Sequence, residues 1–138
     1  MRDLQKELEI ACEACSRAGA VVRRHYERGE TAATLKPDRS PLTEADLAAN
    51  DEILALLRES FPSDGILSEE TADDGSRLTK SRVWIVDPLD GTRDFVERSG
   101  DFAVHVGLAI EGQPRLGAVY KPIGDELYWA VAGEGAYV

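Results

Sequence analysis

The chain has 138 residues with 43% hydrophobic content, which suits a single domain that can bury a core without disulfide bonds. Its formal net charge of -10, from 26 acidic and 16 basic residues, argues against a nucleic acid polymer or an anionic membrane surface as a partner. No signal-like apolar segment follows the charged first residues, and no run reaches the ~20 apolar residues of a membrane span, so we expect a cytoplasmic protein.

The first expected element is a long amphipathic helix over residues 4–26. Apolar or small residues recur at every third or fourth position, which places them on one helix face. Cys12 and Cys15 belong to this face, and His25 has no neighbouring N or S ligands with which to complete a zinc site. We therefore interpret the two cysteines as small hydrophobic side chains in the core.

A short strand over 31–35, a polar and mobile loop over 36–41 and a second helix from 43 to about 60 are predicted next. Thr43 is expected to cap this helix, with Asp46 in the reciprocal acidic position. An acid at this position commonly does no more than satisfy a helix end and its dipole. The apolar face of the helix is predicted to contain Leu47, Ile53, Leu54, Leu56, Leu57 and Phe61.

A paired acid follows a short apolar segment. Residues 65–68 are predicted to form a buried strand that ends at Glu69 and Glu70. Such a pair is more often a solvated loop edge than a ligand site, and it gains weight only from the acids of the next strand. Residues 71–81 are polar and are predicted to be a surface loop or the end of a hairpin.

The next apolar strand leads into two aspartates three positions apart, Asp87 and Asp90. Pro88 is expected to stiffen a turn between them, and Gly91 and Thr92 to open a helix. The strand end would direct two hard oxygen ligands toward one point, and N–H groups at the helix start can hold an anion. This pattern is typical of a metal and phosphate site, although the same residues are ordinary in turns and the spacing is common by chance.

An antiparallel meander is predicted after this motif. Residues 102–110 alternate bulky and small side chains, and we expect the small face to let helices approach closely. Strands over 115–120 and 127–132 follow, and His105 is expected to be a satisfied sheet histidine rather than a base. Residues 136–138 begin another apolar strand, which suggests a truncated chain or a half whose partner lies elsewhere.

Four motifs together resemble the inositol monophosphatase superfamily, in the same order and with similar spacing. They are SPLTEAD at 40–46, LSEE at 67–70, WIVDPLDGTRDF at 84–95 and GDFAV at 100–104. Ser68 and the charged residues after Gly91 and Thr92 are more similar to the 3′(2′),5′-bisphosphate nucleotidases within that superfamily. The resemblance covers nearly the whole chain but only the amino-terminal half of a family member.

The resemblance implies an α+β fold in which two long helices pack on a mainly antiparallel sheet, as in the amino-terminal half of a sugar-phosphatase-like layered α/β sandwich. Residues 1–138 would form one metal- and phosphate-binding domain, with the carboxy-terminal domain absent. Family members take a further metal-ligating aspartate, and most contacts to the leaving group, from that second half. Turnover by this polypeptide alone is therefore the open question.

The resemblance also implies roles for individual residues. The N–H groups of Gly91 and Thr92 would hold the phosphate, and Thr92 would act with Asp46 to orient or deprotonate the attacking water. The Mg²⁺ ligands so implied are Glu69, Asp87, Asp90 and the main-chain carbonyl of Leu89. The residues implied in substrate binding are Glu69, Leu89, Asp90, Gly91 and Thr92.

These expectations converge on a Mg²⁺-dependent phosphomonoesterase. A phosphomonoester is an anion and the protein is acidic, so bound cations must reverse the local field before substrate approaches, and Asp87 would bridge two ions. The expected substrate is adenosine 3′,5′-bisphosphate, with inositol 1-phosphate or a related sugar phosphate as the alternative. A further alternative is a half-domain that binds metal or phosphate without turnover. A homodimer is also considered.

Overall fold

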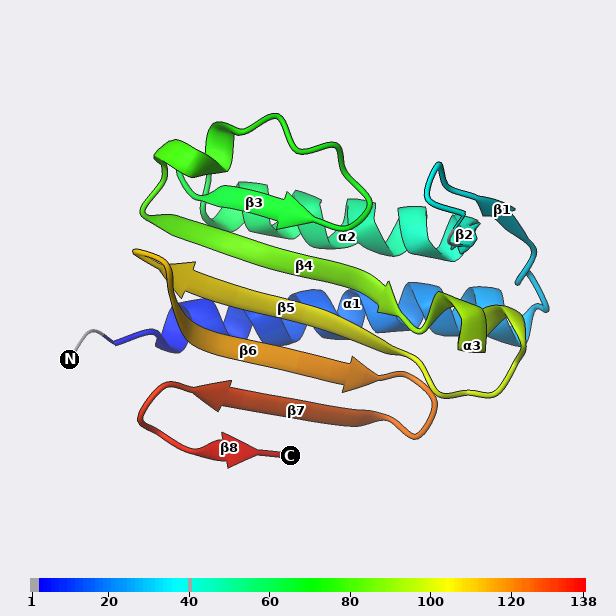
Figure 1. Ribbon diagram of the computed structural model, residues 1–138. Helices are drawn as coiled ribbons and strands as arrows, with labels where there is room; N and C mark the ends of the chain where they lie inside the picture. The colour runs from blue at the N-terminus through cyan, green and yellow to red at the C-terminus, as the bar shows by residue number, and fades with distance from the viewer. Residues whose placement is uncertain (1–2, 40) are drawn as a thin grey trace.

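Two long helices lie along one face of a six-stranded sheet in the computed structural model, which describes residues 3–39 and 41–138 (Figure 1). The helices are α1 (Gln5–Glu27) and α2 (Glu44–Ser60). A two-stranded hairpin, β1 (Ala33–Leu35) with β2 (Pro41–Thr43), connects them. The predicted α+β class, with two helices on a mainly antiparallel sheet, is confirmed.

The sheet has the strand order β3-β4-β5-β6-β7-β8. Only the first pair is parallel, and every later neighbour in the described chain is antiparallel. A 3-10 turn, η1 (Ser76–Thr79), interrupts the predicted loop after β3. The strands are β3 (Gly65–Ser68), β4 (Arg82–Asp90), β5 (Ala103–Ile110), β6 (Gln113–Lys121), β7 (Glu126–Val131) and β8 (Ala136–Tyr137).

Small side chains on α1 let it lie close to the sheet. Cys15 is fully buried, and its Sγ lies 3.8 Å from the carbonyl oxygen of Val104 and 3.6 Å from that of Ala118. A Cβ at Gly19 would lie 2.2 Å from the ring of Tyr120, so only glycine permits this approach. Burial raises the pKa of the Cys15 thiol, which agrees with its interpretation as a core side chain.

The start of α2 is capped as predicted. The Oγ1 of Thr43 accepts the N–H of Asp46 at 3.3 Å, and a carboxylate oxygen of Asp46 accepts the N–H of Thr43 at 2.9 Å. The prediction that Leu47 belongs to the apolar face is wrong, because its side chain is 43% exposed. The residues of α2 that are buried against the core are Ala45, Asp46, Ala49, Asn50, Ile53, Leu54, Leu56 and Leu57.

The two faces of β5 have roles opposite to those expected. Val104, Val106 and Leu108 are buried in the core beneath the helices. The small face, which includes Gly107, points away from them, and no helix of the described residues covers it. The reason is that α1 supplies the small side chains of this contact, and bulky sheet residues then fill the layer between. We call this uncovered side of the sheet the open face.

The hairpin also refines the sequence prediction. Residues 36–41 were expected to be a loop, but Pro41 pairs with Leu35 as part of β2. Ser40, the first residue of the SPLTEAD motif, lies outside the described residues. In the part of the chain that the structure describes, no helix has the length and apolarity that crossing a membrane requires.

Candidate functional site

A bulge in β4 places the two motif aspartates on one face of the sheet. Asp87 pairs with His105 on β5, but Asp90 pairs with Ala103, so β4 carries one extra residue between the two pairs. Side chains three positions apart in a regular strand point to opposite faces, and one extra residue reverses that relation. Both carboxylates therefore share the open face. The turn predicted at Pro88 is wrong, because β4 continues through this bulge to Asp90.

The chain leaves β4 through a glycine that no other residue replaces without strain. Gly91 has a φ of 92°, and a Cβ there would lie 2.9 Å from the carbonyl oxygen of Asp101. The short helix α3 (Thr92–Val96) begins at the next residue, as the sequence predicted. Its first turn is anchored by Phe95, which is fully buried and packs edge-on against Phe102.

The hydroxyl of Thr92 contacts α2 across the site. Its Oγ1 lies 2.9 Å from Oδ1 of Asp46 and 3.1 Å from the carbonyl oxygen of Leu89. Asp46 is fully buried, and its other carboxylate oxygen accepts the N–H of Thr43. Asp46 thus caps the helix and contacts Thr92 at the same time, so the two interpretations of this acid are compatible.

The residues predicted to bind metal and phosphate line one cavity of about 330 Å³, which we call the acid pocket. Asp46 is not among its lining residues and lies behind Thr92. The acid pocket is lined by Lys36, Asp38, Glu69, Glu70, Asp87, Leu89, Asp90, Gly91, Thr92 and Arg93.

The carboxylates of the acid pocket repel one another. Burial, followed by the nearby charges of Asp90 and Glu69, raises the pKa of Asp87 from 3.8 to about 6. His105 and the N–H of Leu89, 3.3 Å from Oδ1 of Asp87, act in the opposite direction. A divalent cation bound among these acids would remove the repulsion, and hard carboxylate oxygens are the ligands that Mg²⁺ prefers.

Two cationic or polar partners that sequence reasoning did not assign to the site also contact these acids. Lys36, from the β1–β2 connection, binds both carboxylate oxygens of Glu70 at 2.9 and 3.1 Å. His105 Nε2 lies 3.3 Å from Oδ2 of Asp90. Among residues 3–39 and 41–138, no three Asp, Glu, His or Cys side chains already converge as a metal-binding group. The carboxylate and carbonyl oxygens are ligand types that suit Mg²⁺. Binding an ion would require these side chains to rotate toward a common point.

Neither contact had a usable signal in the sequence. The alternation along β5 places His105 on the small face, but only the strand register sets it opposite Asp87. Lys36 is one of two cations in a polar loop, and its partner Glu70 lies 34 positions away. Such distant pairings depend on how the elements pack.

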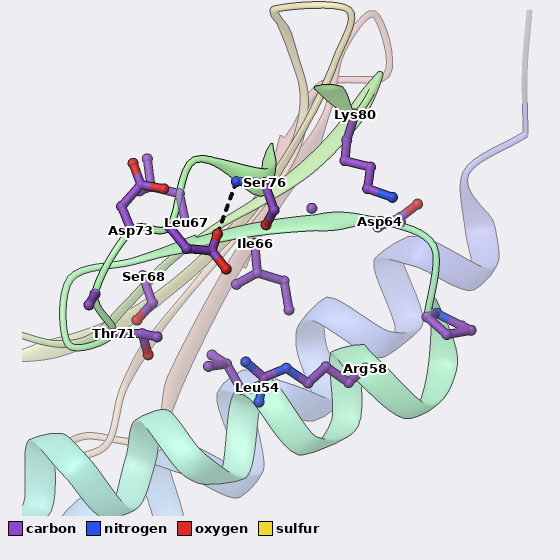
Figure 2. Close-up of a pocket in the computed structure, with 14 residues that line it drawn as sticks. Leu54, Arg58, Asp64, Ile66, Leu67, Ser68, Thr71, Asp73, Ser76 and Lys80 are labelled. Carbon is purple, nitrogen blue, oxygen red and sulfur yellow. Dashed lines mark hydrogen bonds between the residues drawn. The ribbon is translucent and has the colours of Figure 1, made fainter. Parts of the chain in front are cut away.

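A second cavity, of about 310 Å³, lies between α2, β3 and the segment that contains η1 (Figure 2). None of the predicted site residues lines it. Leu54 and Ile66 contribute apolar surface, while Asp64 is paired with Arg82 and Asp73 with Arg77. Because it contains none of the predicted ligands, this cavity adds nothing to the acid pocket.

Comparisons with known proteins agree with the geometry. The model of the inositol monophosphatase family matches residues 3–138. The 3′(2′),5′-bisphosphate nucleotidase CysQ of Salmonella typhimurium is 39% identical over 129 residues, which cover 92% of this chain and 52% of that protein. Inositol monophosphatase 1 of Solanum lycopersicum is 39% identical over 138 residues, covering 98% and 50%.

The fold is also similar to solved structures of proteins from this family. The crystal structure of CysQ from Bacteroides thetaiotaomicron, a bacterial member of the inositol monophosphatase family, has a TM-score of 0.83 and 40% identity to this chain. The match covers 96% of this chain and 48% of that one. The chain therefore spans about half the length of the relatives it matches.

Proposed function

Because the chain belongs to the inositol monophosphatase family, we propose that it supplies the metal- and phosphate-binding half of a Mg²⁺-dependent phosphomonoesterase. One observation carries the proposal: the Thr92 hydroxyl, hydrogen-bonded to the buried Asp46, lines the same pocket as the repelling carboxylates. A hydroxyl held by a carboxylate beside a cluster of acids is suited to activating water next to a divalent cation.

The metal would be held by oxygen donors of the acid pocket. Glu69, Asp87 and Asp90 offer carboxylates and Leu89 offers its main-chain carbonyl, all of which are ligand types that suit Mg²⁺. When bound, Mg²⁺ would lower the pKa of a coordinated water and would neutralise the charge that develops on the leaving oxygen. The raised pKa of Asp87 supports this assignment, because strongly perturbed acids in a cleft are typical of functional sites.

Thr92 and Asp46 would handle the proton of the attacking water. The Thr92 hydroxyl donates to Oδ1 of Asp46, which leaves its oxygen free to accept a hydrogen bond from water in the pocket. As the water attacks phosphorus, its proton can pass to the Thr92 oxygen while the threonine proton passes to Asp46. The N–H of Thr43 fixes the second oxygen of Asp46, so the receiving carboxylate is already oriented.

The substrate phosphate would lie at the start of α3. The first N–H groups of a helix have no acceptor within it, so those of Gly91 and Thr92 are available to phosphate oxygens. Arg93 also lines the pocket and adds a positive charge near this point. We propose that the acid pocket binds the phosphate group of the substrate. On the basis of the motifs that contain Ser68 and Arg93, we propose that this group is the 3′-phosphate of adenosine 3′,5′-bisphosphate.

An inositol or sugar phosphate is the alternative substrate. The CysQ and inositol monophosphatase relatives are both 39% identical to this chain, so overall similarity favours neither. A second candidate function is a half-domain that binds metal or phosphate without turnover. This candidate rests on the acid pocket, whose oxygen donors can bind a cation whether or not turnover follows.

Phosphate release tests both candidates. A family-length form should release phosphate from 3′-phosphoadenosine 5′-phosphate faster than from inositol 1-phosphate, and only with Mg²⁺. The 138-residue chain should bind Mg²⁺ in calorimetry but release negligible phosphate. Faster release from inositol 1-phosphate would reverse the substrate assignment. Vigorous turnover by the 138-residue chain would exclude the binding-only candidate, and absence of Mg²⁺ binding in both forms would overturn the proposal.

A further inference from the structure

Asp90 is contacted from the neighbouring strand by His105, whose Nε2 lies 3.3 Å from Oδ2 of the carboxylate. We propose that His105 is a positioning residue for Asp90: its ring N–H holds one carboxylate oxygen and leaves the other directed into the acid pocket. The proposal rests on the proposed function, because it requires Asp90 to be a metal ligand. His105 would then have a role in metal binding, whereas the sequence predicted only a hydrogen-bonded histidine within a sheet.

The register of the sheet creates this contact. His105 lies directly opposite Asp87, and residues directly opposite in an antiparallel pair have their side chains on the same face. The bulge then turns Asp90 to that face as well. His105 is therefore adjacent to both motif aspartates on the open face, and a regular β4 would have carried Asp90 away from it.

Asp90 needs such a partner because its carboxylate is largely exposed. Its side chain is 60% exposed, and an exposed carboxylate samples several rotamers. In residues 3–39 and 41–138, His105 is the one basic side chain within 4.0 Å of it. Two other acids of the pocket have hydrogen-bond partners: the N–H of Leu89 for Asp87 and Lys36 for Glu70.

The contact requires a hydrogen-bond donor and not a charge. A neutral imidazole with its proton on Nε2 can donate to Oδ2, so the contact does not depend on a charged ring. Hydrogen-bonded partners of metal ligands typically change metal affinity or activity by ~10–100-fold when they are removed, because they orient the ligand. An exposed pair of no consequence would instead leave metal affinity unchanged.

Mg²⁺ affinity measured by calorimetry on the 138-residue chain tests the proposal without any turnover. We expect His105→Ala to weaken binding by ~10-fold. His105→Gln should restore most of the affinity, because its amide N–H reaches about the position of Nε2 and does not titrate. Val119→Ala is the matched control: Val119 pairs with His105 on β6, and it does not line the acid pocket. Circular dichroism should show all variants folded.

A double-mutant cycle shows whether His105 acts through Asp90. Asp90→Asn alone should weaken Mg²⁺ binding, and adding His105→Ala should then have no further effect. Wild-type affinity in His105→Ala, failure of His105→Gln to restore it, or a full effect of His105→Ala beside Asp90→Asn would each overturn the proposal. If Asp90→Asn itself leaves affinity unchanged, or the wild-type chain does not bind Mg²⁺, the proposed metal site fails and His105 loses its role with it.

Discussion

Strand β4 carries charged clusters at both ends, and the two clusters differ in how their charges are balanced. At its start, Arg82 binds Glu7 at 2.9 Å and Asp64 at 3.0 Å, and the indole N–H of Trp84 also donates to Asp64 at 2.9 Å. At its end, Asp87 and Asp90 lie beside further acids, and the pKa of Asp87 is raised to about 6. The acids of the first cluster share a bound cation, whereas those of the second repel one another.

The difference separates stability from function along one strand. Arg82 ties α1 to β4 and to the connection after α2, so its network holds three segments together. The acid end contributes repulsion that the fold must tolerate, and such locally unfavourable arrangements are expected at functional sites. Five residues of extended chain, about 17 Å, keep the two clusters apart. Variants at one end should therefore change binding and turnover, and variants at the other should change unfolding.

The largest effect is expected from Asp90→Asn. In a family-length form this change should abolish phosphate release, because it removes a negative charge from the proposed metal site. The thermal midpoint without metal should stay level or rise, since one repelling carboxylate is gone. Near-normal turnover at ordinary Mg²⁺ concentration would remove Asp90 from the metal site and weaken the contrast between the two ends of β4.

Thr92→Ala should lower turnover of the family-length form by ~10²–10⁴-fold, the usual contribution of a positioned proton acceptor, while Mg²⁺ affinity changes far less. Asp46→Asn should behave similarly and also cost about 1 kcal/mol of stability through the cap of α2. Steady-state kinetics with parallel calorimetry separates the two quantities. Equal losses of affinity and rate in both variants would show that these residues act on the metal and not on the water.

Arg82→Met should destabilise the chain by about 3 kcal/mol, because it leaves two poorly exposed carboxylates, Glu7 and Asp64, without their cation. Arg17→Met is the control, since its pair with Glu13 is about half exposed and should contribute little to stability. Urea unfolding measures both. Mg²⁺ affinity of the folded protein should not change, and a large loss of affinity in Arg82→Met would contradict the separation of the two ends.

The smallest effect concerns the pH dependence of stability without metal. The raised pKa means that folded Asp87 retains a proton that the unfolded chain releases, so stability falls as pH rises from 3.8 to about 6. Solvent screening limits the loss to about 1 kcal/mol. Asp87→Asn should remove this part of the pH dependence in urea unfolding with a chelator present. A variant that keeps the full decline would assign the effect to other groups.

Local patterns accounted for the elements that carry the site. The capping box of Thr43 and Asp46 depends on residues three positions apart, and the alternation along β5 depends on period two, so both could be predicted from the sequence. The prediction of a turn at Pro88 was wrong because it also depended on a local pattern. Proline is common in turns, but it is also tolerated at bulges, and the sequence does not distinguish the two.

The sequence by itself determined the two helices, the strand that delivers Asp87 and, through its motifs, the set of candidate residues. Only the tertiary structure decided which of them meet. Asp46 and Thr92 lie 46 positions apart in the sequence. They come into contact because α2 packs on β4, the strand that leads into α3. The pairing of β4 with β5 creates the bulge that brings Asp90 to His105. Local periodicity specifies the face of one element, whereas register and packing depend on the whole core, and these decide the geometry of the site.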